Sequence, residues 1–337
     1  MPPVGYQDRK LESLAPIKVI VSDYIEQNLD WEASQLSGQD FEFQPLQLKH
    51  APREELKQQL ADAEVLIVNM APMDADILNS LSACKLLIRH GAGADNIDVA
   101  HATKLGIRVC YVPDYCQDEV AEQALLLTLT THRAFPRQVE SLAVSVRKGV
   151  WDFQSIPEFG RLAGLSAGII GCGRIGSRVM RMYRSLDLDV HVCDPYLSVE
   201  RQRDLQVRCE PLTKVLMENT IISIHCALTN ETRGMIDTDA IQNMRPDAIL
   251  INTARGAIVD SHALAEACRN RKIRGAGIDV YVEEPPAPDF PLLDLDNVIL
   301  TPHMSWYSSD AEWSIRKKII EDVFRYKVGE EPRFPLN

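Results

Sequence analysis

The chain has 337 residues, of which 45% are hydrophobic and 25% charged, so it is long enough for two domains that each bury a core. Its 36 Lys and Arg residues against 48 Asp and Glu residues give a net charge of -12, which disfavours direct binding to nucleic acid. No apolar run reaches the roughly 20 residues that a membrane-spanning helix needs, so we expect no membrane association.

The amino terminus and the cysteines indicate a cytoplasmic chain. Residues 1–24 carry charges ahead of the first apolar run, which is too short for a signal peptide. Eight cysteines are scattered without a C-x-x-C pair, which argues against a disulfide framework and a structural zinc site: Cys84, Cys110, Cys116, Cys172, Cys193, Cys209, Cys226 and Cys268.

Short β-branched segments alternate with amphipathic helical segments, which is typical of an α/β protein with parallel sheets. The first third of the chain contains candidate strands at residues 17–23, 63–70, 85–91 and 107–113. Residues 118–135 have helical spacing, and a second helical stretch ends near Lys148, so we place the connection between domains here. Six further strands, enough for one dinucleotide-binding domain, are expected at residues 167–171, 189–193, 220–226, 248–252, 275–280 and 297–301.

A glycine loop follows the first of these six strands. Gly171, Gly173 and Gly176 fit G-x-G-x-x-G between a strand and a helix: the first suits a tight turn, the second lets a pyrophosphate approach, and the third permits close packing. Asp194 ends the next strand, where a carboxylate accepts hydrogen bonds from ribose hydroxyls and repels a 2′-phosphate. We therefore expect NAD rather than NADP; the alternative is that the glycines serve packing alone.

Three loops are expected to meet at one edge of this sheet. In the strand order 3-2-1-4-5-6, the last three strands lie together, and ligands bind outside their carboxyl ends. Arg255 follows the fourth strand, Glu283 and Glu284 the fifth, and His303 the sixth. These groups suit reduction of a 2-oxo acid, in which Arg255 binds the carboxylate and polarises the carbonyl while His303 donates a proton. A carboxylate beside the imidazole holds its orientation and favours its protonated form.

Each of these residues has an ordinary alternative when it is taken alone. Arg255 is then an ordinary surface arginine, Glu284 a solvated charge in a loop, and His303 a capping or core residue. A catalytic zinc is the other alternative for His303, but no H-x-x-H or Cys/His cluster supplies more ligands, and the adjacent His225 and Cys226 face opposite sides of a strand. We expect no metal.

Seven segments together resemble the D-isomer-specific 2-hydroxyacid dehydrogenase family: "RHGAGADNID", "DEVAEQAL", "GIIGCGRIG", "HCALTNETRGMI", "INTARGAIVD", "GIDVYVEEPP" and "LTPHMSWYSS". The resemblance implies two doubly wound parallel-sheet domains with the active site in the cleft between them. A Rossmann NAD-binding domain would span residues 118–304, and a flavodoxin-like substrate-binding domain residues 1–117 and 305–337. The resemblance also implies NAD as the cofactor and a homodimer. The homodimer is further favoured because residues 119–135 offer more apolar surface than one core face needs.

The family's motifs also imply roles for individual residues. Arg255, Glu284 and His303 match the catalytic residues, and Glu284 is preferred to Glu283 because the family's acid directly precedes a proline. Cofactor contacts are implied for Gly171, Gly173, Arg174, Ile175, Gly176, Asp194, Cys226, Ala227, Leu228, Thr232, Thr253, Ala254, Asp279 and His303.

The substrate is expected to be a small 2-oxo or 2-hydroxy acid. Ala92 and Gly93 match the family loop whose backbone N–H groups hold the substrate carboxylate. Residues 303–311 look closest to the C-terminal-binding proteins, in which an indole at the position of Trp306 lies beside the substrate's side chain. With Met304, this favours an apolar or thioether side chain over a phosphate. The alternative is that Trp306 packs under the domain interface.

The function expected is NAD-dependent interconversion of a D-2-hydroxy acid and a 2-oxo acid. Two alternatives stay open: an NAD(H)-sensing scaffold like the corepressors of the C-terminal-binding protein branch, and a phosphoglycerate or hydroxypyruvate/glyoxylate dehydrogenase. Oxidation of formate or phosphite is disfavoured, because Glu284 stands where formate dehydrogenases carry glutamine.

Overall fold

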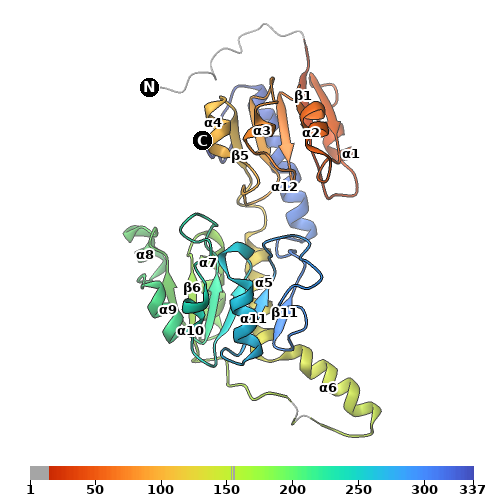
Figure 1. The fold of residues 1–337 in the computed structure, drawn as a ribbon. Helices are drawn as coiled ribbons and strands as arrows, with labels where there is room; N and C mark the ends of the chain where they lie inside the picture. Colours follow the sequence, from red (N-terminus) through yellow and green to blue (C-terminus); the bar gives the residue numbers. More distant parts are fainter. Residues whose placement is uncertain (1–14, 153, 155) are drawn as a thin grey trace. The chain divides into compact units, whose positions relative to one another are not determined.

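The computed structural model describes residues 15–152, 154 and 156–337, and the chain forms two compact units (Figure 1). Unit 1 consists of residues 1–116 and 308–337, and unit 2 of residues 117–307. These limits differ by one to three residues from the domain limits expected from the sequence. Residues 1–14, on which the expected absence of a signal peptide rests, lie outside the described residues.

Unit 1 is built on a parallel five-stranded sheet in the order β2-β1-β3-β4-β5. The strands are β1 (Ile17–Val21), β2 (Phe41–Pro45), β3 (Val65–Val68), β4 (Leu86–Arg89) and β5 (Arg108–Tyr111). The helices are α1 (Asp30–Leu36), α2 (Arg53–Leu60), α3 (Ala75–Leu78), α4 (Val99–Lys104) and α12 (Ser309–Lys327). The order reverses beside β1, so the loops after β1, β3 and β4 emerge together at the carboxyl edge, where doubly wound sheets bind ligands.

The sequence predicts four of these strands and misses β2. β2 is an edge strand whose residues are all half-buried or exposed, so it lacks the continuous apolar run that marks β3 and β4. The carboxyl-terminal helix α12 completes the unit by packing Ile315, Ile319 and Val323 into the core beside β1. These residues lie on one face of α12, and burial of each side chain contributes about 1.5–3 kcal/mol.

Unit 2 is built on a parallel six-stranded sheet in the order β11-β10-β9-β8-β6-β7. The strands are β6 (Ser166–Ile170), β7 (Asp189–Cys193), β8 (Ile221–Ile224), β9 (Ile249–Asn252), β10 (Gly275–Ile278) and β11 (Val298–Leu300). The helices are α5 (Gln117–His132), α6 (Phe135–Arg147), α7 (Arg174–Ser185), α8 (Val199–Leu205), α9 (Leu212–Glu218), α10 (Thr238–Gln242), α11 (Ser261–Arg269) and the short 3-10 helix η1 (Gly256–Ile258). The fold class expected from the sequence, two doubly wound parallel-sheet domains, is confirmed.

The strand order expected for unit 2 was wrong in one respect. The third strand found in the sequence, β8, pairs with β6 at the centre instead of lying outside β7. The outer position is taken by a single parallel bridge between Val192 and Cys209, next to which the N–H of Glu210 donates to the Val192 carbonyl at 2.8 Å. One paired residue between charged neighbours has no apolar run to reveal it. β9, β10 and β11 are nevertheless neighbours, as the site requires.

Helix α5 packs closely on the sheet of unit 2, whereas α6 projects beyond it (Figure 1). A Cβ on Gly277 would lie 2.9 Å from the side chain of Leu127, so glycine permits the close approach of α5 to β10. Within the described ranges, none of the helices combines the length and apolar character needed to cross a bilayer.

Candidate active site

An imidazole and a carboxylate meet beyond β10 and β11. The Nδ1 atom of His303 lies 2.7 Å from both Oε1 and Oε2 of Glu284, and the backbone N–H of Tyr281 donates to Glu284 Oε1 at 3.1 Å. The two side chains are 35% and 32% exposed. Because Nδ1 faces Glu284, Nε2 is the ring nitrogen that is left for a further partner.

The environment keeps Glu284 ionised at neutral pH. Partial burial raises its pKa, but the hydrogen bond and charge of His303, the N–H of Tyr281 and the charge of Arg255 outweigh burial and hold the pKa below its ordinary value.

His303 has an unusual backbone conformation that its neighbours hold in place. Its φ of 50° lies in the left-handed region, which residues other than glycine rarely adopt. The N–H of His303 donates to the carbonyls of Asp279 and Thr301 at 2.8 and 3.0 Å. The fully buried carboxylate of Asp279 accepts the N–H groups of Met304 and Ser305 and the hydroxyls of Thr301 and Ser305. Asp279, expected at the cofactor, thus uses its carboxylate to fix the turn that carries His303.

Arg255 follows β9 in a turn that Asn252 shapes. The Asn252 side chain, in a residue only 1% exposed, donates to the carbonyl of Arg255 at 2.9 Å and accepts the N–H of Ala254 at 3.0 Å. Arg255 is half-buried, and its guanidinium donates to the Ala254 carbonyl at 2.7 Å. The sequence analysis did not assign Asn252, although a polar residue at the end of an apolar strand is a readable signal.

A glycine brings the β9 loop against the β10 loop. A Cβ on Gly256 would lie 2.2 Å from the carbonyl carbon of Tyr281, so no larger residue fits without moving the backbone. The contact also explains why the charge of Arg255 contributes to the lowered pKa of Glu284. Arg255, Glu284 and His303 are therefore assembled at the carboxyl ends of three adjacent strands.

The glycine loop after β6 has the geometry of a phosphate-binding turn. Gly171 has a φ of 86°, and a Cβ there would lie 2.5 Å from the backbone nitrogen of Cys226. A Cβ on Gly176 would lie 2.0 Å from the carbonyl oxygen of Gly171, whereas one on Gly173 would meet no atom within 4 Å. Gly173 caps α7, whose first residue is Arg174, so open space lies at a helix N-terminus.

Polar groups near this loop fit an NAD cofactor. Asp194 follows β7 and accepts the N–H groups of Cys172 and Tyr196 at 2.8 and 3.0 Å, which fixes its carboxylate beside the glycine loop. Thr253 is 7% exposed, and within the described part of the chain its buried Oγ1 has no hydrogen-bond partner. The other predicted contacts lie at the start of α7 or after β8 and β9: Arg174, Ile175, Cys226, Ala227, Leu228, Thr232 and Ala254.

In unit 1, Ala92 and Gly93 form part of the loop after β4. Within residues 15–152, 154 and 156–337, the backbone N–H groups of these two residues donate no hydrogen bond, although both residues are half-buried. Adjacent unpaired N–H groups favour an anion such as a carboxylate.

Apolar side chains follow His303 in unit 2. Trp306 is half-buried and packs edge-on against Tyr307, with ring centroids 5.3 Å apart. Met304 and Tyr307 are 45% and 51% exposed, so apolar surface remains open beside the imidazole.

Another cluster of potential metal ligands lies at β7, the opposite edge of the sheet from β11. The ligand atoms of His191, Glu210 and Glu218 lie within 4.8 Å of one another. The ammonium group of Lys214 is 2.8 Å from Glu210 and 3.8 Å from Glu218, so both carboxylates already interact with a cation.

Comparison with known proteins places this geometry among dehydrogenases. Residues 127–305 match the family model of the D-isomer specific 2-hydroxyacid dehydrogenase, NAD binding domain. Hydroxypyruvate reductase of Thermotoga maritima is 32% identical over 305 residues, which cover 90% of this chain and 97% of that protein. The crystal structure of D-lactate dehydrogenase from Aquifex aeolicus with NAD and lactic acid is 28% identical, with a TM-score of 0.83 over 93% of this chain and 96% of that one.

A longer relative matches over only part of its length. D-3-phosphoglycerate dehydrogenase of Archaeoglobus fulgidus is 35% identical over 286 residues, which are 85% of this chain and 53% of that protein. The chain therefore spans about half the length of this relative.

Proposed function

The chain belongs to the D-isomer specific 2-hydroxyacid dehydrogenase family, with an NAD binding domain at residues 127–305, and we propose that it interconverts a D-2-hydroxy acid and a 2-oxo acid. The observation that carries the proposal is the pair formed by His303 and Glu284, beside Arg255, at the ends of adjacent strands. This set supplies a proton donor, a group that orients it and a cation for a carboxylate.

Each proposed catalytic residue has a distinct task. Arg255 binds the substrate carboxylate and polarises the 2-oxo group. The N–H groups of Ala92 and Gly93 in unit 1 offer donors for a carboxylate. His303 donates the proton on Nε2 to the carbonyl oxygen in reduction and accepts it in oxidation. Glu284 keeps the imidazole oriented. Bound NAD(H) supplies or accepts the hydride.

A panel of 2-oxo acids with NADH, followed by absorbance, tests the activity. We expect NADH oxidation with at least one compound and none when His303 is replaced by asparagine. NADH binding without turnover of any 2-oxo acid would contradict the enzyme and favour the NAD(H)-sensing scaffold.

We further propose that the preferred substrate has a medium-sized apolar side chain. Trp306, Met304 and Tyr307 offer aromatic and thioether surface beside His303, whereas a desolvated phosphate needs paired cations. Within the panel, 4-methylthio-2-oxobutyrate should therefore outperform 3-phosphohydroxypyruvate in kcat/KM, with hydroxypyruvate and glyoxylate between them.

The expected preference for NAD(H) over NADP(H) rests on Asp194. Its fixed carboxylate suits ribose hydroxyls and repels a 2′-phosphate. Fluorescence titration should give a lower dissociation constant for NADH than for NADPH, and Asp194→Ala should narrow the difference. Tighter binding of NADPH by the unaltered protein would contradict this assignment.

We propose that the chain forms a homodimer through α6. The sequence analysis located the surplus apolar surface at residues 119–135, but α5 buries much of it, and a larger stripe is exposed on α6. Phe135, Val139, Leu142 and Val146 recur every three or four residues and are 49% to 56% exposed. A stripe of this kind is typical of a helix that packs against a partner.

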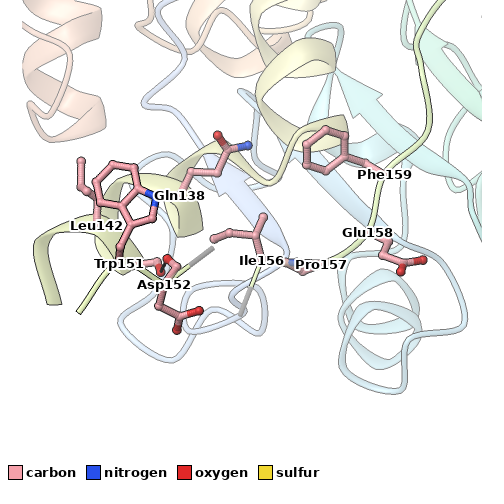
Figure 2. Close-up of a pocket in the computed structure, with 9 residues that line it drawn as sticks. Gln138, Leu142, Trp151, Asp152, Ile156, Pro157, Glu158 and Phe159 are labelled. Carbon is pink, nitrogen blue, oxygen red and sulfur yellow. Dashed lines mark hydrogen bonds between the residues drawn. The ribbon is translucent and has the colours of Figure 1, made fainter. Parts of the chain in front are cut away.

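A hollow beside α6 extends this apolar surface. Its volume is about 540 Å³, and Figure 2 shows Leu142 and Trp151 at one end and Phe159 at the other. Trp151 is 77% exposed. We propose that a second copy of the chain covers α6 and this hollow, because an apolar surface of this extent is costly to leave in water.

Light scattering tests the dimer. The unaltered protein should show twice the 37.8 kDa monomer mass at micromolar concentration. Leu142→Glu should yield monomers, whereas the control Lys148→Glu at the end of α6 should not. A monomer mass for the unaltered protein would refute the proposal.

We also propose a cytosolic location, in which the eight cysteines remain thiols. Burial raises the pKa of Cys84 and Cys268 to about 12, which suits structural thiols in a reducing compartment. Microscopy of a tagged chain in its own cells would test the location, and a signal outside the cytosol would contradict it.

A further inference from the structure

A second imidazole–carboxylate pair lies in unit 1, and we propose that Glu26 and His90 position the N–H groups of Ala92 and Gly93 for an anionic carboxylate. The inference rests on the proposed function, because it gives that carboxylate to the substrate. It assigns Glu26 and His90 as positioning residues, which act through the loop and not on the reacting atoms.

The pair is buried at the carboxyl edge of the sheet. The Nε2 atom of His90 lies 3.2 Å from Oε1 of Glu26, and the side chains are 9% and 2% exposed. Oε2 of Glu26 accepts the N–H of Ile25 at 3.0 Å, so both carboxylate oxygens have a partner. The N–H of His90 donates to the carbonyl of Val68 at 2.7 Å, which fixes the residue directly after β4.

Side chains tie together the three loops at this edge. The carboxylate of Asp23, after β1, accepts the N–H groups of Asn69, Met70 and Ala71 after β3, at 3.3, 2.6 and 3.2 Å. The side chain of Asn96, after β4, donates to the carbonyls of Asn69 and Ala71 at 3.2 and 2.9 Å.

The N–H groups of Ala92 and Gly93 lie between two residues whose side chains contact other loops. Ala92 and Gly93 stand between His90 and Asn96, each of which is held by a side-chain contact to another loop. The N–H groups at 69–71 are consumed by Asp23, whereas those of Ala92 and Gly93 donate no hydrogen bond to any residue that the structure describes. Two open donors at this edge therefore lie in the segment that Glu26 and His90 anchor.

The charges of Glu26 and His90 should also affect a carboxylate bound at the N–H groups of Ala92 and Gly93. Burial lowers the pKa of His90 and Arg89 acts in the same direction, while Glu26, Asp23 and Glu32 oppose them. Glu32 is itself paired with Arg316 of α12, at 2.6 Å. His90 precedes Ala92 by two residues in the chain, and its protonation at lower pH offsets the charge of Glu26. A bound carboxylate is then held more tightly.

The competing explanation is that the pair only fills the core. A structural role would reduce stability and all kinetic parameters together. A positioning role separates the affinity for the carboxylate from the chemical step, and it makes that affinity depend on the proton of His90.

The experiment uses Glu26→Gln and His90→Gln in the full chain, with the most active 2-oxo acid and with oxamate as an unreactive carboxylate probe. In His90→Gln, KM and the oxamate dissociation constant should rise about tenfold, while kcat and NADH affinity change less than about twofold. In Glu26→Gln, loss of the anchor weakens carboxylate binding and loss of the carboxylate charge favours it, so both constants should rise less than in His90→Gln. His101→Gln is the control, because the imidazole of this half-buried α4 residue lies 2.8 Å from the side chain of Asn79.

The pH dependence supplies the second readout. In the unaltered protein, oxamate should bind more tightly as pH falls and His90 gains its proton, and Glu26→Gln should move that change to lower pH. Unchanged oxamate affinity and pH dependence in both variants would overturn the inference, and so would parallel losses of kcat and NADH affinity. Turnover by the unaltered enzyme reports separately on the proposed function.

Discussion

The molecule contains the same chemical pair twice, in two environments. Glu284 and His303 in unit 2 are about one-third exposed, whereas Glu26 and His90 in unit 1 are almost fully buried. The exposed pair is open to solvent, which suits the proton donor that we propose. The buried pair lacks that access, which suits the positioning role that we propose for it. On these proposals, exposure and not residue type separates a proton donor from a positioning contact.

The largest effect is expected from the exposed pair. His303→Ala should lower kcat by about 10²- to 10⁴-fold, because it removes the proton donor of the proposed reaction, while NADH affinity should fall far less than kcat. Steady-state kinetics at saturating NADH and a fluorescence titration measure the two quantities. His101→Ala is the control on the imidazole of a half-buried residue in unit 1. A kcat within tenfold of the unaltered value would assign the proton transfer elsewhere.

The second prediction concerns stability, for which the buried pair should show the larger effect. Glu26→Ala leaves a buried imidazole, whose pKa burial lowers, without its hydrogen-bond partner and should lower the free energy of unfolding by about 1–3 kcal/mol. Glu284→Ala removes a partly exposed carboxylate and should cost about 1 kcal/mol or less. Urea unfolding followed by circular dichroism compares the two variants. Equal losses would show that burial does not distinguish the pairs.

The sequence predicts what local pattern determines. Apolar runs locate nearly all the strands, and the family resemblance is confirmed by the family match. The loops with Arg255, Glu284 and His303 follow neighbouring strands because the order of β9, β10 and β11 follows from parallel topology. These features depend on residues close together in the chain.

The sequence did not predict features that depend on residues brought together only by the fold. The bridge at Cys209 involves only one paired residue, so no sequence pattern marks it. The exposed apolar stripe on α6 has the same pattern as an amphipathic helix that packs on its own core. From the sequence, the carboxylate of Asp279 is equally suited to bind a cofactor or to fix a turn. In the fold it accepts the N–H groups of the turn after β11. The pairing of Glu26 with His90 joins two loops that are far apart in the chain, with no pattern to link them.

The third prediction concerns the pH profile of the exposed pair. Because its pKa is lowered, Glu284 is ionised at neutral pH and loses its charge only in acid. Below that lowered pKa, the carboxyl group that faces Nδ1 of His303 is protonated, so the reduction rate of the unaltered enzyme should fall at the acid end of its profile. Glu284→Gln has no group that titrates there, so its profile should lack this acid limb and its rate at neutral pH should be lower. Reduction and oxidation rates across the pH range measure the difference, and an unchanged profile would assign the orienting role to another residue.

The smallest expected effect concerns Trp306, which follows His303 of the exposed pair by three residues in the chain. Its ring is half-buried and packs edge-on against Tyr307, and Met304 adds exposed thioether surface. If the indole contacts the substrate's side chain, Trp306→Ala should reduce kcat/KM for 4-methylthio-2-oxobutyrate relative to glyoxylate by up to tenfold, or about 1.4 kcal/mol. Tyr307→Phe is the control, because it keeps the ring contact and removes only a hydroxyl. The two substrates share their reacting atoms, so a general loss of His303 geometry would lower both values together. A change confined to the larger substrate therefore assigns the indole to side-chain recognition. An unchanged ratio would leave Trp306 as a packing residue of the turn.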